Sequence, residues 1–186
     1  MKQIWVLVLI VFIINSAFAF DLADHSVIDQ PPTVNGQLPT VNGQLPTANG
    51  LNREAFYKAM EENKKELVNT QLEELKTAPE ELRQAFIGAM MMKRASFVAA
   101  AGVKLRYFRE GHKMLESAIK KDPDNVEYRF LRLMIQEHTP PVVGYRGDIQ
   151  KDSEFIRKSY KSLSPEIQQF IADYNKKSKF LKLDVS

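Results

Sequence analysis

The stretch ESAIKKDPDNVEYRFLR, residues 116–132, has the pattern of two helices that meet at a tight corner. Asp122 and Pro123 predict the end of the first helix, because the residue before a proline is driven out of the α-helical region. Asp124 and Glu127 have the spacing of an N-terminal capping box for the second helix. A short corner of this kind joins antiparallel helices, so the stretch predicts a fold built from helical hairpins.

Helical patterns extend on both sides of this corner and fill residues 52–175. No stretch alternates apolar and polar residues for long enough to form a sheet. Caps and Pro-Glu starts divide the range into about six helices, expected near 52–76 (with room for a break at Asn63), 79–102, 103–121, 125–138, 148–160 and 165–174. The predicted fold class is therefore all-α, with antiparallel helical hairpins.

Two of these helices carry specific expectations about burial. Residues 125–138 are apolar around most of the helix circumference, which predicts a helix in the middle of the domain. The helix before it should bury a stripe made of Leu105, Phe108, Leu115, Ala118 and Ile119. The helix at 79–102 should start with a capping box at Thr77 and Glu80 and end at Gly102.

Residues 1–19 have the three-part pattern of a secretory signal peptide. Lys2 gives a positive start, residues 4–14 are an unbroken apolar run, and cleavage is predicted after Ala19. An uncleaved anchor is the alternative, but a spanning helix needs about 20 apolar residues. The sequence therefore predicts an exported protein, periplasmic or extracellular after cleavage.

Residues 20–51 predict a disordered linker that contains a repeat. The unit PTVNGQL occurs twice from residue 32 onward and is followed by the degenerate unit PTANGLN. Each unit holds one proline and one Asn-Gly turn signal, which exclude central strands and coiled-coil helices. We therefore expect a mobile stalk ahead of the helical domain.

Composition excludes several kinds of chemistry. The chain has no cysteine, so disulfides, thiol catalysis and sulfur-bound zinc are ruled out. Its 26 basic residues against 23 acidic ones give a formal net charge of +3, to which the C-terminal residues contribute strongly. Because nucleic-acid binding needs a basic face, and the globular part is near neutral by count, we expect no nucleic-acid partner.

The basic C-terminal tail, residues 176–186, has two interpretations. Its lysines alternate with Phe180 and Leu181, a pattern that would give weak contact with an anionic membrane surface. The other interpretation is a frayed, solubilising end of the last helix, and it is the one favoured here. The lysines concerned are Lys176, Lys177, Lys179 and Lys182.

Residues 92–125 resemble one helical hairpin of the tetratricopeptide type. The positions that match its packing pattern are Ala99, Gly111, Leu115, Ala118 and Pro123. Two aromatic residues that are usual in the first helix of such a repeat are replaced by Ala95 and Gly102. The resemblance implies TPR-like packing, in which Ala99 and Gly111 are the small residues where the paired helices touch.

A second resemblance covers more of the chain. It runs through AFIGAMMMKRASF at 85–97, EYRFLRLMIQEHTPPVVGY at 127–145 and IRKSYKSLSPEIQQFIADY at 156–174. These segments are similar to small exported proteins of Bacteroidota. The resemblance implies a periplasmic location and a helical fold, and it implies no particular activity.

Few residues offer catalytic or ligand chemistry. No histidine has a second and third ligand at helical spacing, so no metal and no cofactor are predicted. No phosphate-binding glycine loop and no nucleophile elbow occur. One polar cluster is a candidate site, consisting of Arg129, Arg132, Glu137, Tyr145 and Asp148. A structural role for it is favoured, because buried arginines need acidic partners whatever the function.

Three functions remain open from the sequence. The favoured one is a non-catalytic module that binds a protein or peptide in a groove between helices, an inference by fold analogy. The second is a small-molecule-binding protein or enzyme with its site around Arg129, Arg132 and Tyr145. The third is a peripheral envelope protein that uses the basic tail. The lack of a catalytic constellation argues for the first.

Overall fold

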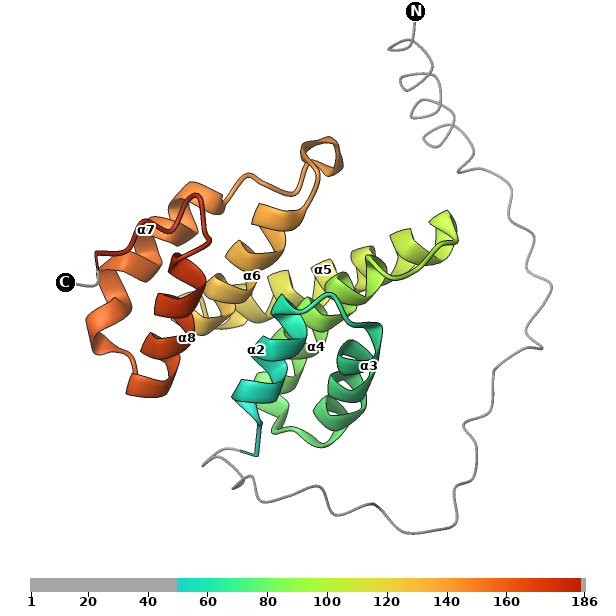
Figure 1. Ribbon diagram of the computed structural model, residues 1–186, viewed down its shortest axis with the longest axis horizontal. Coiled ribbons are helices and arrows are strands. Elements are labelled where there is room, and N and C mark those ends of the chain that lie inside the picture. The colour runs from blue at the N-terminus through green and yellow to red at the C-terminus, as the bar shows by residue number, and fades with distance from the viewer. Residues whose placement is uncertain (1–49, 185–186) are drawn as a thin grey trace, which may run out of the picture. The chain divides into compact units, whose positions relative to one another are not determined.

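The computed structural model of the chain describes residues 50–184, and within this range all regular structure is helical. The predicted all-α fold is confirmed, because no strand occurs among these residues. The predicted signal peptide and nearly all of the predicted linker lie outside the described range. The helices, shown in Figure 1, are α2 (Arg53–Glu61), α3 (Lys65–Glu74), α4 (Glu80–Ala95), α5 (Ala101–Lys121), α6 (Val126–His138), α7 (Ile149–Ser159) and α8 (Pro165–Asn175).

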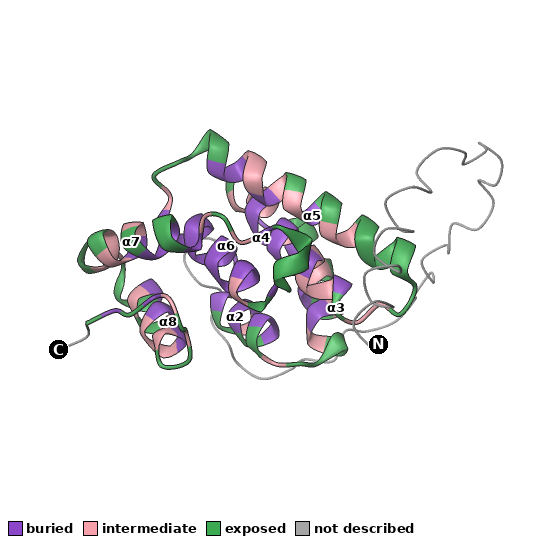
Figure 2. Cartoon of the chain, turned by 90° about the horizontal axis from the view of Figure 1, so that it is seen from above, coloured by how far each residue is buried: buried purple, intermediate pink, exposed green. Residues whose placement is uncertain are grey.

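Helix α6 lies at the centre of the domain, as its apolar circumference predicted. Eleven of its 13 residues are buried, and Figure 2 shows it buried along its length. The ring of Phe130 packs against Tyr57 of α2 and Tyr174 of α8, with centroid distances of 5.6 and 5.5 Å. A helix that contacts neighbours on all sides has no solvent face, so even its arginines must find partners inside the domain.

Helices α4 and α5 form an antiparallel hairpin whose backbones touch at two glycines. A Cβ atom added to Gly111 would lie 2.5 Å from the carbonyl oxygen of Gly88. The prediction that Ala99 is the small residue facing Gly111 is therefore wrong, and Gly88 takes that place. Because positions 88 and 111 oppose each other, the midpoint of the hairpin falls near residue 99. Ala99 is accordingly exposed in the turn.

The helix boundary predicted at Gly102 is also wrong. Helix α4 ends at Ala95, and the next three amides bond to carbonyls three residues earlier, which tightens and closes the helix end. Gly102 lies inside the first turn of α5. The other tetratricopeptide-type positions behave as expected: Leu115 and Ala118 are buried, and Pro123 follows the end of α5.

The first half of α5 projects beyond the rest of the domain. Eight of the ten residues 101–110 are exposed, and in Figure 1 the α4–α5 turn extends past the other helices. The predicted buried stripe is thus wrong at Leu105, which is 48% exposed, and only partial at Phe108. The stripe fails here because α4 ends at Ala95, so no helix covers this part of α5.

Several predicted caps are replaced by other contacts. Asn125, not Asp124, caps α6, since its side-chain oxygen accepts from the amide of Tyr128 at 3.1 Å. The side chain of Glu127 instead pairs with Arg53. The capping box at Thr77 is absent, because the Thr77 hydroxyl donates to the carbonyl of Glu74 at 2.9 Å. The side chains of Glu127 and Thr77 thus have partners other than the amides that the local pattern assigned to them.

Other local signals are confirmed. The first predicted helix breaks at residues 62–64, between α2 and α3, as the polar sequence around Asn63 indicated. Ser164 precedes α8, and Pro165 takes the first helical position, where its fixed φ suits the helix start. No helix within residues 50–184 has the length and apolar character that a membrane span requires.

The C-terminal residues 176–184 pack against the domain instead of forming a separate frayed tail. The carboxylate of Glu137 accepts hydrogen bonds from the Ser178 hydroxyl at 2.8 Å and from the Lys179 and Phe180 amides at 3.0 and 3.1 Å. Leu181 is fully buried, so the apolar residues of this segment complete the core. The predicted boundary after residue 175 is therefore wrong, because the carboxylate of Glu137 and the buried Leu181 hold the segment against the domain.

Replacing Gly111 with alanine is expected to lower the free energy of unfolding by about 1–3 kcal/mol, the usual effect of overpacking. The added Cβ meets the backbone carbonyl oxygen of Gly88, which cannot rotate away as the end of a side chain could. Gly102→Ala is the matched control in the same helix, where nothing lies within 4 Å of the new atom. Helix propensity predicts that this control stabilises by up to about 1 kcal/mol. Equal effects in urea denaturation would contradict the glycine contact.

Candidate functional site

The predicted polar cluster forms in part, around a carboxylate that sequence reasoning missed. Asp152 of α7 is fully buried and binds both predicted arginines. Its oxygens accept from Arg129 Nη1 at 3.1 Å and from Arg132 Nε and Nη2 at 2.7 and 2.8 Å. Arg132 Nη1 also donates to Glu116 of α5 at 2.8 Å. One acid of α7 therefore holds two arginines of α6.

Tyr145 and Asp148 join this network from the loop between α6 and α7. The Tyr145 hydroxyl donates to Glu116 Oε1 at 2.6 Å, and Asp148 Oδ2 lies 3.5 Å from Arg132 Nη1. Burial, together with the hydrogen bond to Glu116, raises the pKa of Tyr145 well above its ordinary value. These contacts tie α5, α6 and α7 together at one point.

Glu137, the fifth predicted member, does not belong to the cluster. Its carboxylate points to the C-terminal segment, where it accepts from the Tyr174 hydroxyl as well as from residues 178–180. On helix α6 it lies five residues after Arg132, a spacing that puts the two on different faces. The prediction grouped Glu137 with the arginines by proximity in sequence, and the helix phase separates them.

The arginine network has the properties of a structural element. Burial alone would lower the pKa of Arg132. The carboxylates of Asp152, Glu116 and Asp148 outweigh this effect and raise the pKa above its ordinary value. The guanidinium groups face acids of this chain, and Arg129 Nε donates to the Pro123 carbonyl at 2.8 Å. Few donors are left for a ligand, which agrees with the structural interpretation of the cluster.

A second buried ion pair fixes α2 to α6. Arg53 binds Glu127 through two hydrogen bonds of 2.9 and 3.1 Å, and the Tyr57 hydroxyl donates to the same carboxylate at 3.0 Å. Burial raises the pKa of Tyr57 well above its ordinary value. The polar atoms of this pair are thus largely satisfied within the chain.

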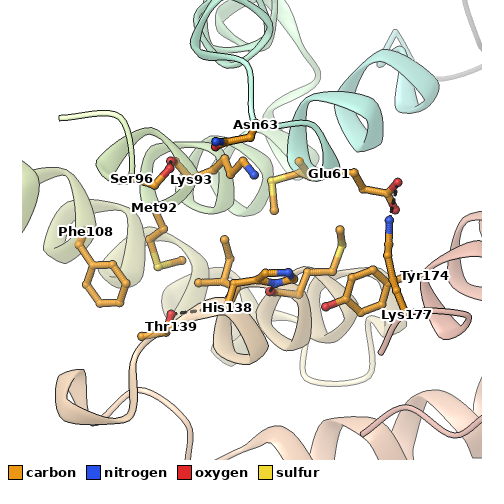
Figure 3. Close-up of a pocket in the computed structure, with 13 residues that line it drawn as sticks. Glu61, Asn63, Met92, Lys93, Ser96, Phe108, His138, Thr139, Tyr174 and Lys177 are labelled. Atoms are coloured by element: carbon orange, nitrogen blue, oxygen red, sulfur yellow. Dashed lines mark hydrogen bonds and ion pairs between the residues drawn. The ribbon is translucent and has the colours of Figure 1, made fainter. Parts of the chain in front are cut away.

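A cavity of about 410 Å³ opens at the other end of α6. Its walls come from α2, α4, α5, α6, α8 and the residues that follow α8, so that residues distant in sequence meet there (Figure 3). Three methionines give it a flexible apolar surface that adapts to different shapes. The lining residues are Met60, Glu61, Asn63, Met92, Lys93, Ser96, Phe108, Met134, Ile135, His138, Thr139, Tyr174 and Lys177.

Lys93 is the cation that this cavity leaves without a close partner. Its ammonium makes no hydrogen bond and no ion pair with residues 50–184. Burial lowers the pKa of Lys93, the charge of Glu61 partly offsets this, and Lys177 lowers it further. Lys177 itself pairs with Glu61 at 2.7 Å. The cavity therefore presents one partly desolvated positive charge beside an apolar surface.

Three other polar side chains of the cavity, Ser96, His138 and Thr139, are hydrogen-bonded to backbone carbonyls. The Ser96 and Thr139 hydroxyls donate to the carbonyls of Lys93 and Ile135, each at 2.7 Å. His138 Nδ1 lies 2.8 Å from the Met134 carbonyl, which requires a proton on that nitrogen and leaves Nε2 as the acceptor of the neutral ring. Neither hydroxyl is aligned with the imidazole, so the lining supplies no activated nucleophile.

Metal chemistry finds no support in the described part of the chain. No group of three or more His, Asp and Glu side chains in residues 50–184 could hold an ion. His112 packs its ring against Tyr145 at a centroid distance of 4.4 Å, and His138 bonds a carbonyl. His25 lies outside the described residues.

Tyrosine ionisation is expected to be suppressed in the folded protein. Burial is the main reason why the pKa of four of the six tyrosines lies above the ordinary value of 10.0. These groups stabilise the fold below pH 10 and lose that contribution as the pH rises above it. Phenolate absorbance just above about pH 10 should be clearly smaller in native than in urea-unfolded protein. The tyrosines concerned are Tyr57, Tyr128, Tyr145 and Tyr174.

Comparison with family models, curated proteins and solved structures finds no match to this chain. The resemblance of residues 92–125 to a tetratricopeptide-type hairpin therefore stays a prediction, as does the similarity to small exported proteins of Bacteroidota. What can be inferred about function comes from the geometry of the domain itself.

Proposed function

We propose that this protein is a non-catalytic binding module, and that a protein or peptide segment binds it at the cavity between α2, α4, α6 and α8. One observation carries the proposal: Lys93, a cation without a close counter-ion, lines the same cavity as a methionine-rich apolar surface. A cavity with one charge and a flexible apolar wall suits a segment that presents an acidic group beside a large apolar side chain.

The charge of the segment follows from the electrostatics of Lys93. Burial without a close counter-ion makes its ammonium less stable than in water, which is why its pKa is lowered. A carboxylate from a bound segment would restore the missing partner. Lys177 cannot take this role as readily, because Glu61 already pairs with it at 2.7 Å.

The same electrostatics separate a binding role from a structural one. A lysine whose pKa is lowered in the folded state costs stability at neutral pH, because its charged form is disfavoured there. We therefore expect Lys93→Met to leave the thermal midpoint unchanged or to raise it. A clear fall in the midpoint would mean that the ammonium has a structural partner and is not held for a ligand.

Two further points support binding over catalysis. The Ser96 and Thr139 hydroxyls of the cavity donate to backbone carbonyls, and no side chain prepares them for attack. The alternative site around Arg129, Arg132 and Tyr145 has its polar groups occupied by Asp152 and Glu116. Export, predicted from residues 1–19, would place the module where segments of other envelope proteins are available.

Selection of peptides tests this proposal. A phage-displayed library of random peptides is selected on the chain from residue 20 onward, and the Kd of the selected peptides is measured by fluorescence polarisation. We expect an acidic residue next to Leu, Ile, Phe or Met among them. Lys93→Met should weaken binding about tenfold to hundredfold, the effect of losing a charged hydrogen bond, and Lys93→Arg should retain it.

Variants of exposed residues locate the binding site. Asn63 lies at the mouth of the cavity, and Asn63→Trp should obstruct it without disturbing the core (Figure 3). Lys120→Trp, an exposed change on α5 outside the cavity lining, is the control and should leave the Kd unchanged. Peptides that bind the Asn63 and Lys93 variants as tightly as the wild type would contradict the proposal.

A further inference from the structure

The net positive charge of the described domain is confined to one segment, residues 93–113 around the α4–α5 turn. This segment holds six Lys and Arg residues and one Glu, a net charge of +5. The other described residues, 50–92 and 114–184, hold 19 basic and 19 acidic residues and are neutral in sum. A charge of one sign at one end of a neutral domain attracts a polyanion to that end.

Three of these cations share one face of α5. Arg106, Arg109 and Lys113 follow the spacing i, i+3, i+7, which aligns side chains along a helix. All three are exposed, and none of them forms a hydrogen bond or ion pair with the residues from 50 to 184. Figure 2 shows this end of α5 exposed to solvent. Their charges are therefore available to an external partner.

Exposed apolar side chains occur on α5 and in the loop that contacts it. The loop before α7 meets α5 through Tyr145, whose ring lies 5.8 Å from that of Phe108 and 4.4 Å from that of His112. Leu105 is on the same line of α5, three residues before Phe108. Residues 141–143 belong to the same loop, two to four residues before Tyr145. The large apolar residues exposed in the described range are Val103 (37%), Leu105 (48%), Val142 (70%) and Val143 (47%).

We propose that this surface docks on an anionic phospholipid bilayer. We call it the docking face, and it consists of Val103, Leu105, Arg106, Arg109, Lys113, Val142 and Val143. Its cations meet lipid phosphates, and its aliphatic side chains enter the boundary between headgroups and acyl chains. The inference does not depend on the cavity, whose lining includes none of these residues.

The apolar residues decide between a lipid surface and a nucleic acid. Nucleic acids offer phosphates to the cations, but their protein interfaces are polar and give exposed valines and leucines little to bury against. A bilayer offers phosphates and hydrocarbon within a few ångströms of each other. The C-terminal segment is a weaker candidate, because Lys176 and Lys177 already pair with Asp173 and Glu61 at 2.6 and 2.7 Å.

Vesicle flotation tests the proposal. The protein is the chain from residue 20 onward, because the apolar run at residues 4–14 would itself enter a bilayer. The vesicles contain phosphatidylcholine alone or a two-to-one mixture with phosphatidylglycerol. We expect binding to the anionic vesicles only, and weaker binding as salt is added.

Matched variants assign the binding to the docking face. Replacing Arg106, Arg109 and Lys113 with glutamine should reduce partitioning into the anionic vesicles roughly 100-fold, because each cation near an anionic surface contributes to the binding free energy. The control replaces three exposed lysines elsewhere with glutamine and should stay within about threefold of the wild type, because distant charges are screened. The control positions are Lys151, Lys158 and Lys161.

Serine at Leu105, Val142 and Val143 tests the apolar part of the face and should reduce partitioning about tenfold or more. Three results would overturn the proposal: no flotation of the wild type with anionic vesicles, an equal loss in both glutamine triples, or full binding by the serine triple. A mixed-sequence single-stranded DNA that competes fully with the vesicles would assign the face to nucleic acid instead. Melting curves establish that each variant is folded.

Discussion

Replacing Asp152 with alanine is expected to lower the free energy of unfolding by about 3–5 kcal/mol, as measured by urea denaturation. The change removes a fully buried carboxylate that binds Arg129 and Arg132. Both arginines remain in the interior, at 8% and 4% exposure, so their charges cannot be rehydrated easily. Arg132 keeps Glu116, whereas Arg129 loses its only acidic partner among the ion pairs of residues 50–184.

Glu154→Ala provides the control for this prediction. Glu154 lies two residues away on the same helix and is exposed, and among residues 50–184 its side chain accepts a hydrogen bond only from Gln150 across one turn. Its replacement should change stability by less than about 0.5 kcal/mol. If the two variants unfold at the same urea concentration, Asp152 is not the buried centre of the network.

A triple variant separates the energy of the ion pairs from the energy of unpaired charges. Arg129→Met, Arg132→Met and Asp152→Leu together remove the charges and keep most of the volume. Buried ion pairs replaced by apolar groups are often neutral in stability, so this variant should recover most of what the single change loses. No recovery would mean that the network contributes more than it costs to bury.

The central position of α6 was predicted correctly from its sequence. A helix that is buried on all sides has apolar residues around its whole circumference, and this pattern can be read from the residues of that helix alone. The acid that its arginines need was not identified, since Asp152 lies 20 residues beyond Arg132. A signal was nevertheless present: Asp152 shares a helical face with Ile149 and Ile156, which places it on the buried side of α7.

Other features depend on contacts that no local pattern contains. Glu137 collects donors from residues 174–180, and the cavity draws its lining from five parts of the chain. Local cap rules failed at Glu127 for the same reason, because Arg53 binds it from 74 residues away. The basic end of α5 was not predicted, because the net charge of the whole domain does not show where along the chain the basic residues cluster.

The register between α4 and α5 was predicted only in part. The tetratricopeptide-type spacing placed Gly111, Leu115 and Ala118 correctly on the packed side of α5. It failed at Ala99 because the pattern counts residues from one helix to the next and assumes a fixed turn. Here Gly88 opposes Gly111, and the turn shifts accordingly. Spacing within one helix was therefore predictable, and spacing across the turn was not.

Replacing Leu115 with alanine is expected to cost about 2–5 kcal/mol of unfolding free energy, the range for large-to-small changes in a core. Leu115 is fully buried, and its backbone lies against Gly88, where the backbones of α4 and α5 are in contact. The helices cannot move together to fill the space, which places the cost toward the upper end of that range.

Leu105→Ala, the control, is the same chemical change ten residues earlier in the same helix, at a side chain that is 48% exposed. It should cost less than about 1 kcal/mol. Equal losses would show that α5 is buried along its whole length, as the sequence pattern first indicated, and would remove the exposed face proposed for lipid.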